Sequence, residues 1–408
     1  MTIVPGKQAL VPAAEALDKV VRGATPLPHE AVAIEQADGR VLAQDVKSLR
    51  SQPPFDVSAM DGYAARAEDL AANKALKLVG ESAAGHKLEH KLQAGEAARI
   101  FTGAVVPDGA NVVVEQESAT RDGDLVTLAS YEAGKNIRAA GVDFREGDVI
   151  LKKGERLTPR ALSLAASMDH ASVLCARRPR VAIFSTGDEL VPPSAGGAPE
   201  RIVASNQYSI AALCAREGAE VIDTRILKDR LELIFEAIQG ASNHADVVVT
   251  LGGASVGDHD LIRPALDKAG AVIDFHKIAL RPGKPTMSGG LGKARLLGLP
   301  GNPVSTYVCG VIFLLPLLRA LQGMNVPIPK PQRAVLGADV WENDHRADYV
   351  RSASHIDDQG RRVVMPFLKK SQDSSYVSVL ARADCLLIRE PNAAAAKAGE
   401  ICEIIPLD

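Results

Sequence analysis

The sequence of 408 residues has 47 lysines and arginines against 50 aspartates and glutamates, so its formal net charge of −3 is nearly balanced. The scattered basic residues indicate neither a nucleic-acid nor an anionic-membrane surface, and the 4% of aromatic residues offer no stacking platform for single-stranded nucleic acid. A chain of this length is expected to form several domains.

We expect neither a secretion signal nor a membrane span. The first residues, MTIVPGKQ, lack a basic segment followed by an apolar core. The longest apolar run, 308–318, is too short to cross a bilayer and contains Pro316, so it predicts a buried helix. The five cysteines are widely spaced, which favours core thiols in a reducing cytoplasm over disulfides or a CxxC metal site.

The N-terminal part is predicted to be a linking domain that carries an inserted β domain. Segments 12–21 and 159–168 have helical patterns, and the second starts with Thr158 as N-cap and Pro159 at the first helical position. Residues 45–145 are rich in glycine and turn residues and predict mostly strands. We expect the two helices to pack together, which makes 1–44 and 146–179 one elongated helical and β linking domain.

Residues 180–325 predict an α/β domain with a mostly parallel sheet. Apolar strands alternate with amphipathic helices, as in βαβ units. The expected strands are 181–185, 220–227, 246–251, 271–275 and 295–299, and the expected helices follow Ser205, carry Leu231 to Ile238, span 261–269 and follow Pro303.

Residues 326–408 predict a small, barrel-like C-terminal β domain. The proline-rich segment 326–332 is typical of a linker. The short strands expected after it are 334–341, 348–355, 362–368, 384–389 and 400–406.

Acidic residues follow three successive strands of the α/β domain. Because the carboxyl ends of parallel strands meet at one edge of a sheet, we expect these acids to lie together. Oxygen-rich sites suit Mg²⁺, which could bridge the acids and a phosphate held by the glycine loop. Alternatively, Asp229 and Asp260 cap helices and Asp188 is a turn residue. The acids are Asp188, Glu189, Asp229, Asp258 and Asp260, and the loop contains Gly252, Gly253, Ser255 and Gly257.

Basic residues follow the fourth strand and are expected at the same edge. Lys277, Arg281 and Lys284 fall within eight positions, and neighbouring prolines and a glycine stiffen the segment. A rigid basic loop suits an oxyanion or a phosphate, although a solvated charged loop is the alternative.

Two further segments carry candidate residues. After the fifth strand, Pro300 and Gly301 precede Asn302 at an N-cap and Pro303 at the first helical position, where free amides could bind an anion. In the N-terminal half, the segment 53–64 places Asp61 in a tight Asp-Gly turn, which a plain β-turn also explains.

Five motifs in order resemble the molybdopterin molybdenumtransferase family, the bacterial relatives of the E domain of gephyrin. The resemblance covers essentially the whole chain. The motifs are PPFDVSAMDGYA (53–64), FSTGDEL (184–190), GGASVGDHD (252–260), RPGKP (281–285) and GLPGNPVS (298–305).

The resemblance implies an enzyme of molybdenum cofactor biosynthesis. It would insert molybdenum from molybdate into adenylylated molybdopterin in a Mg²⁺-dependent step that releases AMP. It would be a cytoplasmic homodimer whose active site lies between the α/β domain of one subunit and the inserted domain of the other, and its partners could include other proteins of the same biosynthesis.

The resemblance also implies residue roles by motif position. Asp188, Glu189, Asp229, Asp258 and Asp260 would surround the metal and the pyrophosphate, and the last four of these residues would be the metal ligands. Lys277, Arg281 and Lys284 would hold molybdate or phosphate, and Pro300 and Pro303 would shape the pterin-nucleotide pocket. The partner subunit would supply Asp61 and Thr102, and Arg138 and Asp143 match another functional stretch of the same domain. In the C-terminal domain, the matching residue is Ser374. Arg281 stands where some members are expected to have lysine.

Two other functions remain open at this point. An ATP-dependent molybdopterin adenylyltransferase shares the middle fold, although residues 1–179 and the C-terminal domain argue against it. A scaffold without turnover is the second, because gephyrin shows that this architecture can cluster receptors.

Overall fold

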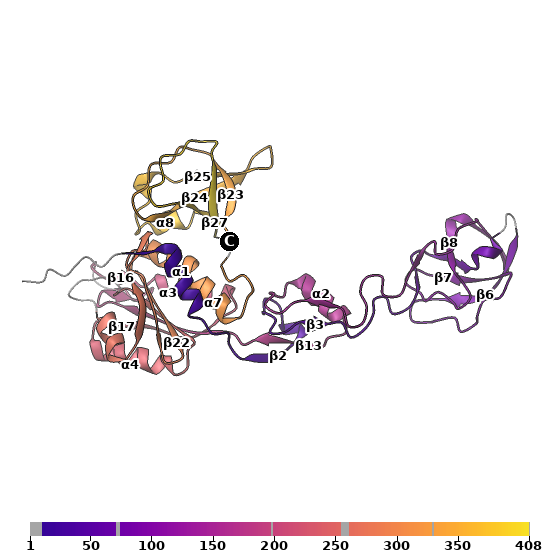
Figure 1. Cartoon of the computed structure of the whole chain (residues 1–408), viewed down its shortest axis with the longest axis horizontal. Helices are drawn as coiled ribbons and strands as arrows, with labels where there is room; N and C mark the ends of the chain where they lie inside the picture. Colours follow the sequence, from indigo (N-terminus) through magenta and orange to yellow (C-terminus); the bar gives the residue numbers. More distant parts are fainter. Residues whose placement is uncertain (1–9, 71–73, 197–198, 254–260, 329, 408) are drawn as a thin grey trace, which may run out of the picture.

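The computed structural model describes residues 10–70, 74–196, 199–253, 261–328 and 330–407. Figure 1 shows an elongated molecule, with the α/β domain and the C-terminal barrel at one end and the inserted β domain at the other. A slender linking region joins the two ends, so residues of the inserted domain lie far from the α/β sheet of the same chain.

The α/β domain contains a six-stranded sheet in the order β17-β14-β18-β22-β21-β19. The first four strands are parallel, and β21 runs antiparallel to both of its neighbours. The predicted mostly parallel sheet is confirmed, but β21 was not predicted, because its Ser-Gly-Gly centre lacks an apolar pattern. The elements are β14 Arg180–Thr186, α3 Asn206–Arg216, β17 Glu220–Leu227, α4 Leu231–Ser242, β18 Val247–Leu251, α5 Ile262–Lys268, β19 Val272–His276, β21 Met287–Leu291 and β22 Ala294–Leu299.

A long apolar helix fills the core beside this sheet. It consists of α6 (Pro303–Cys309), a π-helical turn (Gly310–Leu314) and α7 (Leu315–Leu321). Its 19 residues are long and apolar enough to cross a membrane, but 72% of the most apolar window is buried inside the fold. The prediction of a buried helix is therefore confirmed.

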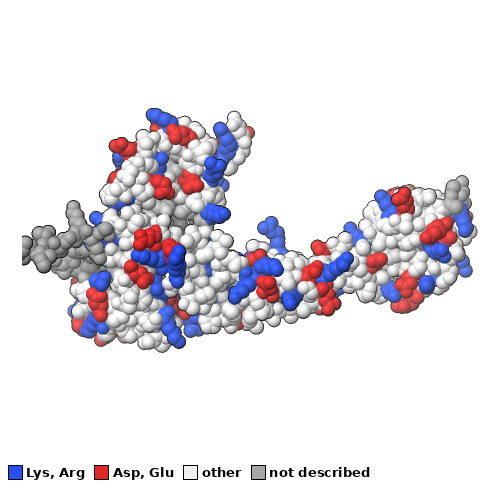
Figure 2. All heavy atoms as spheres, in the orientation of Figure 1, with Lys and Arg blue, Asp and Glu red and all other residues white. Residues whose placement is uncertain are grey.

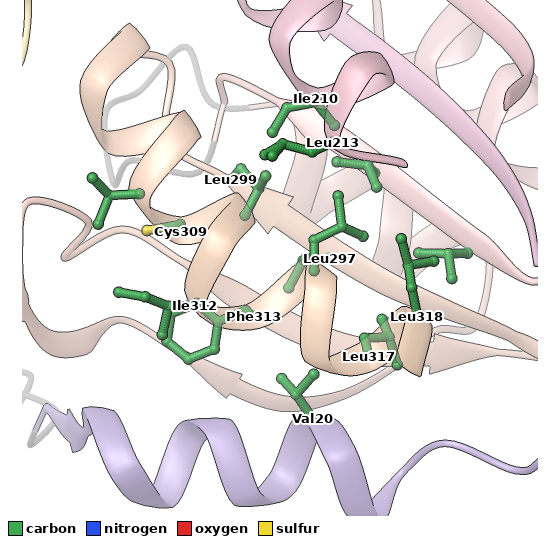
Figure 3. Packing of buried hydrophobic residues seen from close by; sticks show 14 of the residues in the cluster. Val20, Ile210, Leu213, Leu297, Leu299, Cys309, Ile312, Phe313, Leu317 and Leu318 are labelled. Carbon is green, nitrogen blue, oxygen red and sulfur yellow. The ribbon is translucent and has the colours of Figure 1, made fainter. Parts of the chain in front are cut away.

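Helix α1 (Ala13–Arg22) packs on the α/β domain. Figure 3 shows Val20 of α1 facing Leu317 of α7 in a shared core. Helix α2 (Pro159–Ser167) instead buries Ala165 in a separate core within the linking region. The prediction that the two helices pack together is wrong, because the apolar stripe of α1 is buried against α7.

The linking region consists of paired short strands and α2. Strand β2 (His29–Ala33) pairs with β13 (Ser172–Ala176), and β3 (Val46–Lys47) pairs with β12 (Val149–Leu151). The Thr158 side chain accepts a hydrogen bond of 3.3 Å from the Ala161 amide, so the predicted N-cap of α2 is confirmed.

The inserted domain is a six-stranded β sheet in the order β8-β5-β7-β6-β10-β9. This agrees with the predicted mostly β fold. Strands β4 and β11 pair as a two-stranded ribbon at the neck of the domain, which is the end that joins the linking region. The strands are β4 Val57–Ser58, β5 Gly62–Ala65, β6 Ala75–Ser82, β7 Glu96–Ile100, β8 Val112–Glu115, β9 Ala119–Asp122, β10 Leu125–Leu128 and β11 Ile137–Arg138.

The C-terminal domain is a closed five-stranded barrel, as predicted in outline. The strand order is β24-β25-β23-β27-β26, and β26 pairs back with β24. Strand β20 (Ile278–Arg281) joins the barrel to the rest of the chain, because it pairs with β24 and with β1 (Val11–Pro12). The barrel elements are β23 Gln332–Leu336, β24 Ala347–Ile356, β25 Arg362–Pro366, α8 Val377–Leu380, β26 Cys385–Arg389 and β27 Ile401–Pro406.

The distribution of surface charge and the state of the cysteines agree with the predictions made from the composition. On the face shown in Figure 2, basic and acidic side chains are interspersed over both ends of the molecule. All five cysteines are free thiols, and four of them are buried.

Candidate functional site

The ends of β14 and β17 bring two carboxylates together. The Asp188 amide donates to Asp229 Oδ2 over 3.3 Å, and the Asp229 amide donates to Asp188 Oδ1 over 3.4 Å. Helix α4 has Arg230 as its N-cap and no side-chain cap, so the alternative role of Asp229 as an N-cap is wrong. The two acids instead fix each other across neighbouring strand ends.

Glu189 and two basic residues complete this corner. A Cβ added to Gly187 would lie 2.6 Å from each carboxylate oxygen of Glu189, so this carboxylate folds over the glycine backbone. The Asp188 carbonyl accepts hydrogen bonds from Lys228 Nζ over 3.1 Å and from Arg201. The corner is therefore rich in oxygen atoms and carries flanking positive charge.

Glycines let the ends of β14, β18 and β22 approach closely. A Cβ on Gly252 would lie 3.1 Å from the Thr186 carbonyl oxygen, and one on Gly301 would lie 3.4 Å from the Gly252 Cα. Gly252 has φ +92°, and Gly253 has φ +59°. The predicted convergence of strand ends is thus present up to Gly253. Ser255, Gly257, Asp258 and Asp260 lie outside the described residues, and so does the alternative role of Asp260 as a helix cap.

A small cavity of about 100 Å³ lies at these strand ends. Asn206 at the start of α3 donates from Nδ2 to the Gly301 carbonyl over 2.7 Å and so holds one wall in place. The Pro300 carbonyl, beside Gly301, accepts from the Thr306 hydroxyl over 2.5 Å. The cavity is lined by residues that include Thr186, Glu189, Asn206, Gly301 and Pro303.

The C-terminal domain contacts the segment beside this cavity through Ser374. Asn302 is the N-cap of α6 and Pro303 its first residue, as predicted. The Asn302 side chain, however, donates to Ser374 Oγ over 2.8 Å, and the Val304 amide donates to the Ser374 carbonyl over 3.1 Å. The expectation of free amides at this helix start is therefore wrong for Val304, and Ser374 joins the Pro300–Pro303 segment.

Lys277 and Lys284 line a different and larger cavity, of about 910 Å³. Leu17 of α1 and Tyr349 and Glu390 of the barrel line it too. The cavity at the strand ends has none of these lining residues, so the two lysines and Glu189 line separate cavities. Lys277 directly follows β19, which runs in the same direction as β22, so it leaves the sheet at the predicted edge. Strand β20 then buries Ile278 and Leu280 between α1 and the barrel.

Arg281 is bound to the barrel. Its guanidinium forms ion pairs with Asp344 over 3.0 Å and Asp348 over 3.3 Å, and donates to Asn343 Oδ1 over 3.0 Å. A hydrogen bond from Arg346, together with the charge of Arg281, lowers the pKa of Asp344 to about 2. Burial raises the pKa of Asp348, and Arg281 opposes that rise. In this structure Arg281 joins two domains.

The Asp61 carboxylate is held by Thr102. Asp61 Oδ1 accepts from the Thr102 amide over 2.7 Å and from its hydroxyl over 2.8 Å. The backbone bond, followed by the hydroxyl bond, lowers the pKa of Asp61, and the charge of Arg99 adds to this. Asp61 lies in a bend directly before β5, with its carboxylate exposed at the inserted-domain end of the chain; the predicted Asp-Gly turn is not present, because Gly62 already belongs to the strand.

Arg138 and Asp143 lie at the neck of the same domain. Arg138 ends β11, and both side chains are exposed. The segment is fastened by the Asp143 amide, which donates to the Gln52 carbonyl over 3.1 Å, and by the Ala140 amide, which donates to Asp56 Oδ1 over 2.8 Å. The structure therefore groups Asp61, Thr102, Arg138 and Asp143 in one domain, apart from Glu189 and Asp229.

The sequence prediction missed Arg351. It is fully buried in β24, where its guanidinium donates to the Ser371 carbonyl over 3.2 Å and burial lowers its pKa. Its amide also donates to the Gln372 side chain over 3.1 Å. Arg351 thus supports the segment that leads to Ser374. An arginine inside an apolar strand pattern was the available signal.

The described donors are of the kind that Mg²⁺ takes, because they are carboxylate and backbone oxygens. Across the described ranges, no group of three or more His, Cys, Asp or Glu residues is close enough to hold a metal by itself. The donor set of Glu189 and Asp229 therefore fits Mg²⁺ in type, and the remaining predicted ligands, Asp258 and Asp260, belong to the undescribed loop.

Comparisons with known proteins cover nearly the whole chain. Residues 11–168 match the MoeA N-terminal region (domain I and II), 182–320 a probable molybdopterin binding domain, and 333–407 the MoeA C-terminal region (domain IV).

Curated relatives and solved structures agree with these matches. The molybdopterin molybdenumtransferase of Haemophilus influenzae is 36% identical over 94% of this chain and 95% of its own, and that of Staphylococcus aureus (strain COL) is 30% identical over 99% and 97%. A molybdopterin biosynthesis MoeA protein from Pyrococcus horikoshii superposes with a TM-score of 0.83 at 31% identity, covering 98% and 100% of the two chains. The chain therefore belongs to the molybdopterin molybdenumtransferase family of enzymes.

Proposed function

We propose that this protein inserts molybdenum from molybdate into adenylylated molybdopterin, in a Mg²⁺-dependent reaction that releases AMP. The observation that carries the proposal is the corner where Asp188 and Asp229 bond reciprocally beside Glu189 and the glycine-lined strand ends. Close backbone approach suits a phosphate chain, and the carboxylates suit the cation that accompanies it.

Separate groups of residues would bind the cation, the oxyanion and the nucleotide. Molybdate and the pyrophosphate link are both anionic, so bringing them together is unfavourable without compensating charge. Glu189 and Asp229, with Asp258 and Asp260, would hold Mg²⁺, which when bound supplies positive charge to the anhydride. Lys277 and Lys284 would attract the oxyanion from their cavity, while Gly301, Pro303 and Ser374 would shape the nucleotide-binding wall.

We also propose a homodimer with shared sites. Asp61 and Thr102 form a finished hydrogen-bonded pair at the opposite end of the chain from Glu189 (Figure 1). Apolar side chains near them are exposed: Phe55 by 59%, Met60 by 42% and Val142 by 66%. A partner subunit's α/β domain would cover this patch and bring its acids to Asp61.

The assay supplies adenylylated molybdopterin, Mg²⁺ and molybdate and measures AMP by chromatography. We expect AMP release that requires molybdate and stops on chelation of Mg²⁺. AMP release that ignores molybdate would contradict the proposal. Adenylylation of molybdopterin with ATP would assign the adenylyltransferase activity instead, and no turnover with either substrate would favour a scaffold. We place the reaction in the cytoplasm, and the five free thiols support this location. We also propose that the protein contacts other proteins of the same biosynthesis.

A further inference from the structure

We propose that Arg99 is a positioning residue for the Asp61–Thr102 pair. The inference deepens the proposed function, since it rests on Asp61 acting in the reaction. It starts from one side chain in the middle of the inserted sheet that touches the surroundings of both members of the pair.

The Arg99 guanidinium is held between two aromatic rings. Arg99 lies in β7 opposite Tyr63 of β5. Its guanidinium carbon is 5.1 Å from the centre of the Tyr63 ring and 4.9 Å from that of Phe101. Two cation–π contacts fix the plane of the guanidinium, which is only partly exposed.

Its hydrogen bonds reach the bend that carries Asp61. Arg99 Nη1 donates to the Gly62 carbonyl over 3.2 Å, and Nη2 donates to Gln116 Oε1 over 2.8 Å. The Gln116 amide in turn donates to the Asp61 carbonyl over 3.0 Å. Arg99 therefore reaches the Gly62 carbonyl directly and the Asp61 carbonyl through Gln116.

The same side chain also contacts the residue that precedes the other member of the pair. Phe101, which stacks on Arg99, directly precedes Thr102, whose amide and hydroxyl hold the Asp61 carboxylate. The positive charge of Arg99 further favours the ionised carboxylate. One residue thus connects the bend, the hydrogen-bond donor and the charge of the site.

Arg99 is not part of the apolar core of the inserted domain. The apolar core of the domain is formed by other residues, among them Leu70, Leu76 and Val126, while Arg99 donates to the Gly62 carbonyl and to Gln116. A forked, planar cation is suited to fixing several groups at once, which a lysine cannot do.

The test uses the full-length protein as Arg99→Met, Arg99→Lys and, as a matched control, Arg121→Met. Arg121 is an exposed arginine of the same sheet, and among the described residues its side chain donates only to the Gly123 carbonyl in its own turn. Two readouts are needed: kcat and KM for molybdate-dependent AMP release, and titration of the Asp61 carboxyl followed by ¹³C NMR.

We expect Arg99→Met to lower kcat by about 10- to 100-fold, because a displaced reacting group loses its orientation. KM should change less, and Asp61 should titrate at higher pH. Arg99→Lys should restore the titration but only part of kcat, and Arg121→Met should change neither.

Wild-type kcat and an unshifted Asp61 titration in Arg99→Met would overturn the proposal. If the wild-type protein releases no AMP, the proposed function fails, while the titration still decides the role of Arg99. Should Arg99→Met not fold, Gln116→Leu breaks one link only: a lowered kcat would support the proposal, and an unchanged kcat would contradict it.

Discussion

The two ends of the chain carry acids of different construction. At the inserted-domain end, Asp61 is held by Thr102 within one domain, and its carboxylate is exposed. At the α/β end, Asp188, Glu189 and Asp229 sit on strand ends that glycines bring together, and Ser374 of the barrel closes the neighbouring wall. The first is a single carboxylate oriented within one domain, and the second is a corner assembled from several segments.

This difference shows how the functional groups at each end are oriented. Local hydrogen bonds are enough to orient one carboxylate, whereas a phosphate cradle needs several strands and a second domain to converge. Because the two ends lie far apart in one chain, the site that we propose requires two subunits (Figure 1). The following variants test each end separately.

The largest effect is expected at Asp61. Asp61→Asn keeps the size of the side chain and its acceptor for Thr102, but removes the charge. We expect kcat for AMP release to fall by about 100- to 1,000-fold, as for loss of a general acid–base or electrostatic group, with an unchanged thermal midpoint. Asp122→Asn, on the exposed strand β9, is the control. Full activity of Asp61→Asn would remove Asp61 from the reaction.

The next effect is expected at Arg281, and it concerns stability. Arg281→Met leaves the buried carboxylate of Asp348 without its ion-pair partner, so we expect a loss of about 2 kcal/mol in urea unfolding at pH 7. Lys397→Met, which breaks the exposed pair with Asp339, should change little.

The pH dependence of this loss has a definite sign. Burial raises the pKa of Asp348 and Arg281 opposes the rise, so the variant should have a still higher folded pKa. The folded state of the variant then binds a proton more tightly than the unfolded chain, and the stabilisation from protonation is lost as pH rises through that pKa. The difference from wild type should therefore shrink as the pH falls toward 5, and a difference that grows would contradict this account.

A smaller effect is expected at Gly252. Gly252→Ala forces a side chain into φ +92° and to within 3.1 Å of the Thr186 carbonyl, so we expect a loss of about 1–2 kcal/mol and a marked loss of activity. Gly270→Ala has a similar φ of +79° but open space around the added carbon. It should lower stability somewhat and leave AMP release unchanged; equal losses of activity in both variants would refute a role for the glycine approach.

The smallest effect is expected in the linking region between the two ends. Thr158→Ala removes the N-cap of α2, at a cost of about 1 kcal/mol in chemical unfolding, with unchanged kcat. A changed kcat would show that the linking region acts on the chemistry.

The same comparison explains what could be predicted from sequence. Continuous apolar runs such as β18 (Val247–Leu251) identified the parallel strands, and the closely spaced motifs identified the acids. Strand β20 escaped prediction because its partners are Val11, Pro12, Ala347 and Asp348, far away in sequence. As a result, Arg281 was interpreted as part of a free basic loop.

Contacts that depend on register were equally hidden. The segment that carries Asp61 was identified from its motif, but the bond of Asp61 to Thr102 spans 41 residues. The stacking of Arg99 on Tyr63 follows from the pairing of β5 with β7, which no local pattern reveals.

The most direct test of the central claim, that two subunits complete one site, is to mix two inactive variants. Asp61→Asn lacks the inserted-domain acid, and Asp229→Asn lacks the strand-end acid. After subunit exchange, half of the dimers are mixed and each contains one intact site, so the mixture should recover about a quarter of wild-type AMP release. Asp61→Asn mixed with Thr102→Ala should recover none, because every site then lacks an intact inserted domain. A mixture of Asp61→Asn and Asp229→Asn that exchanges subunits and stays inactive would contradict the shared site.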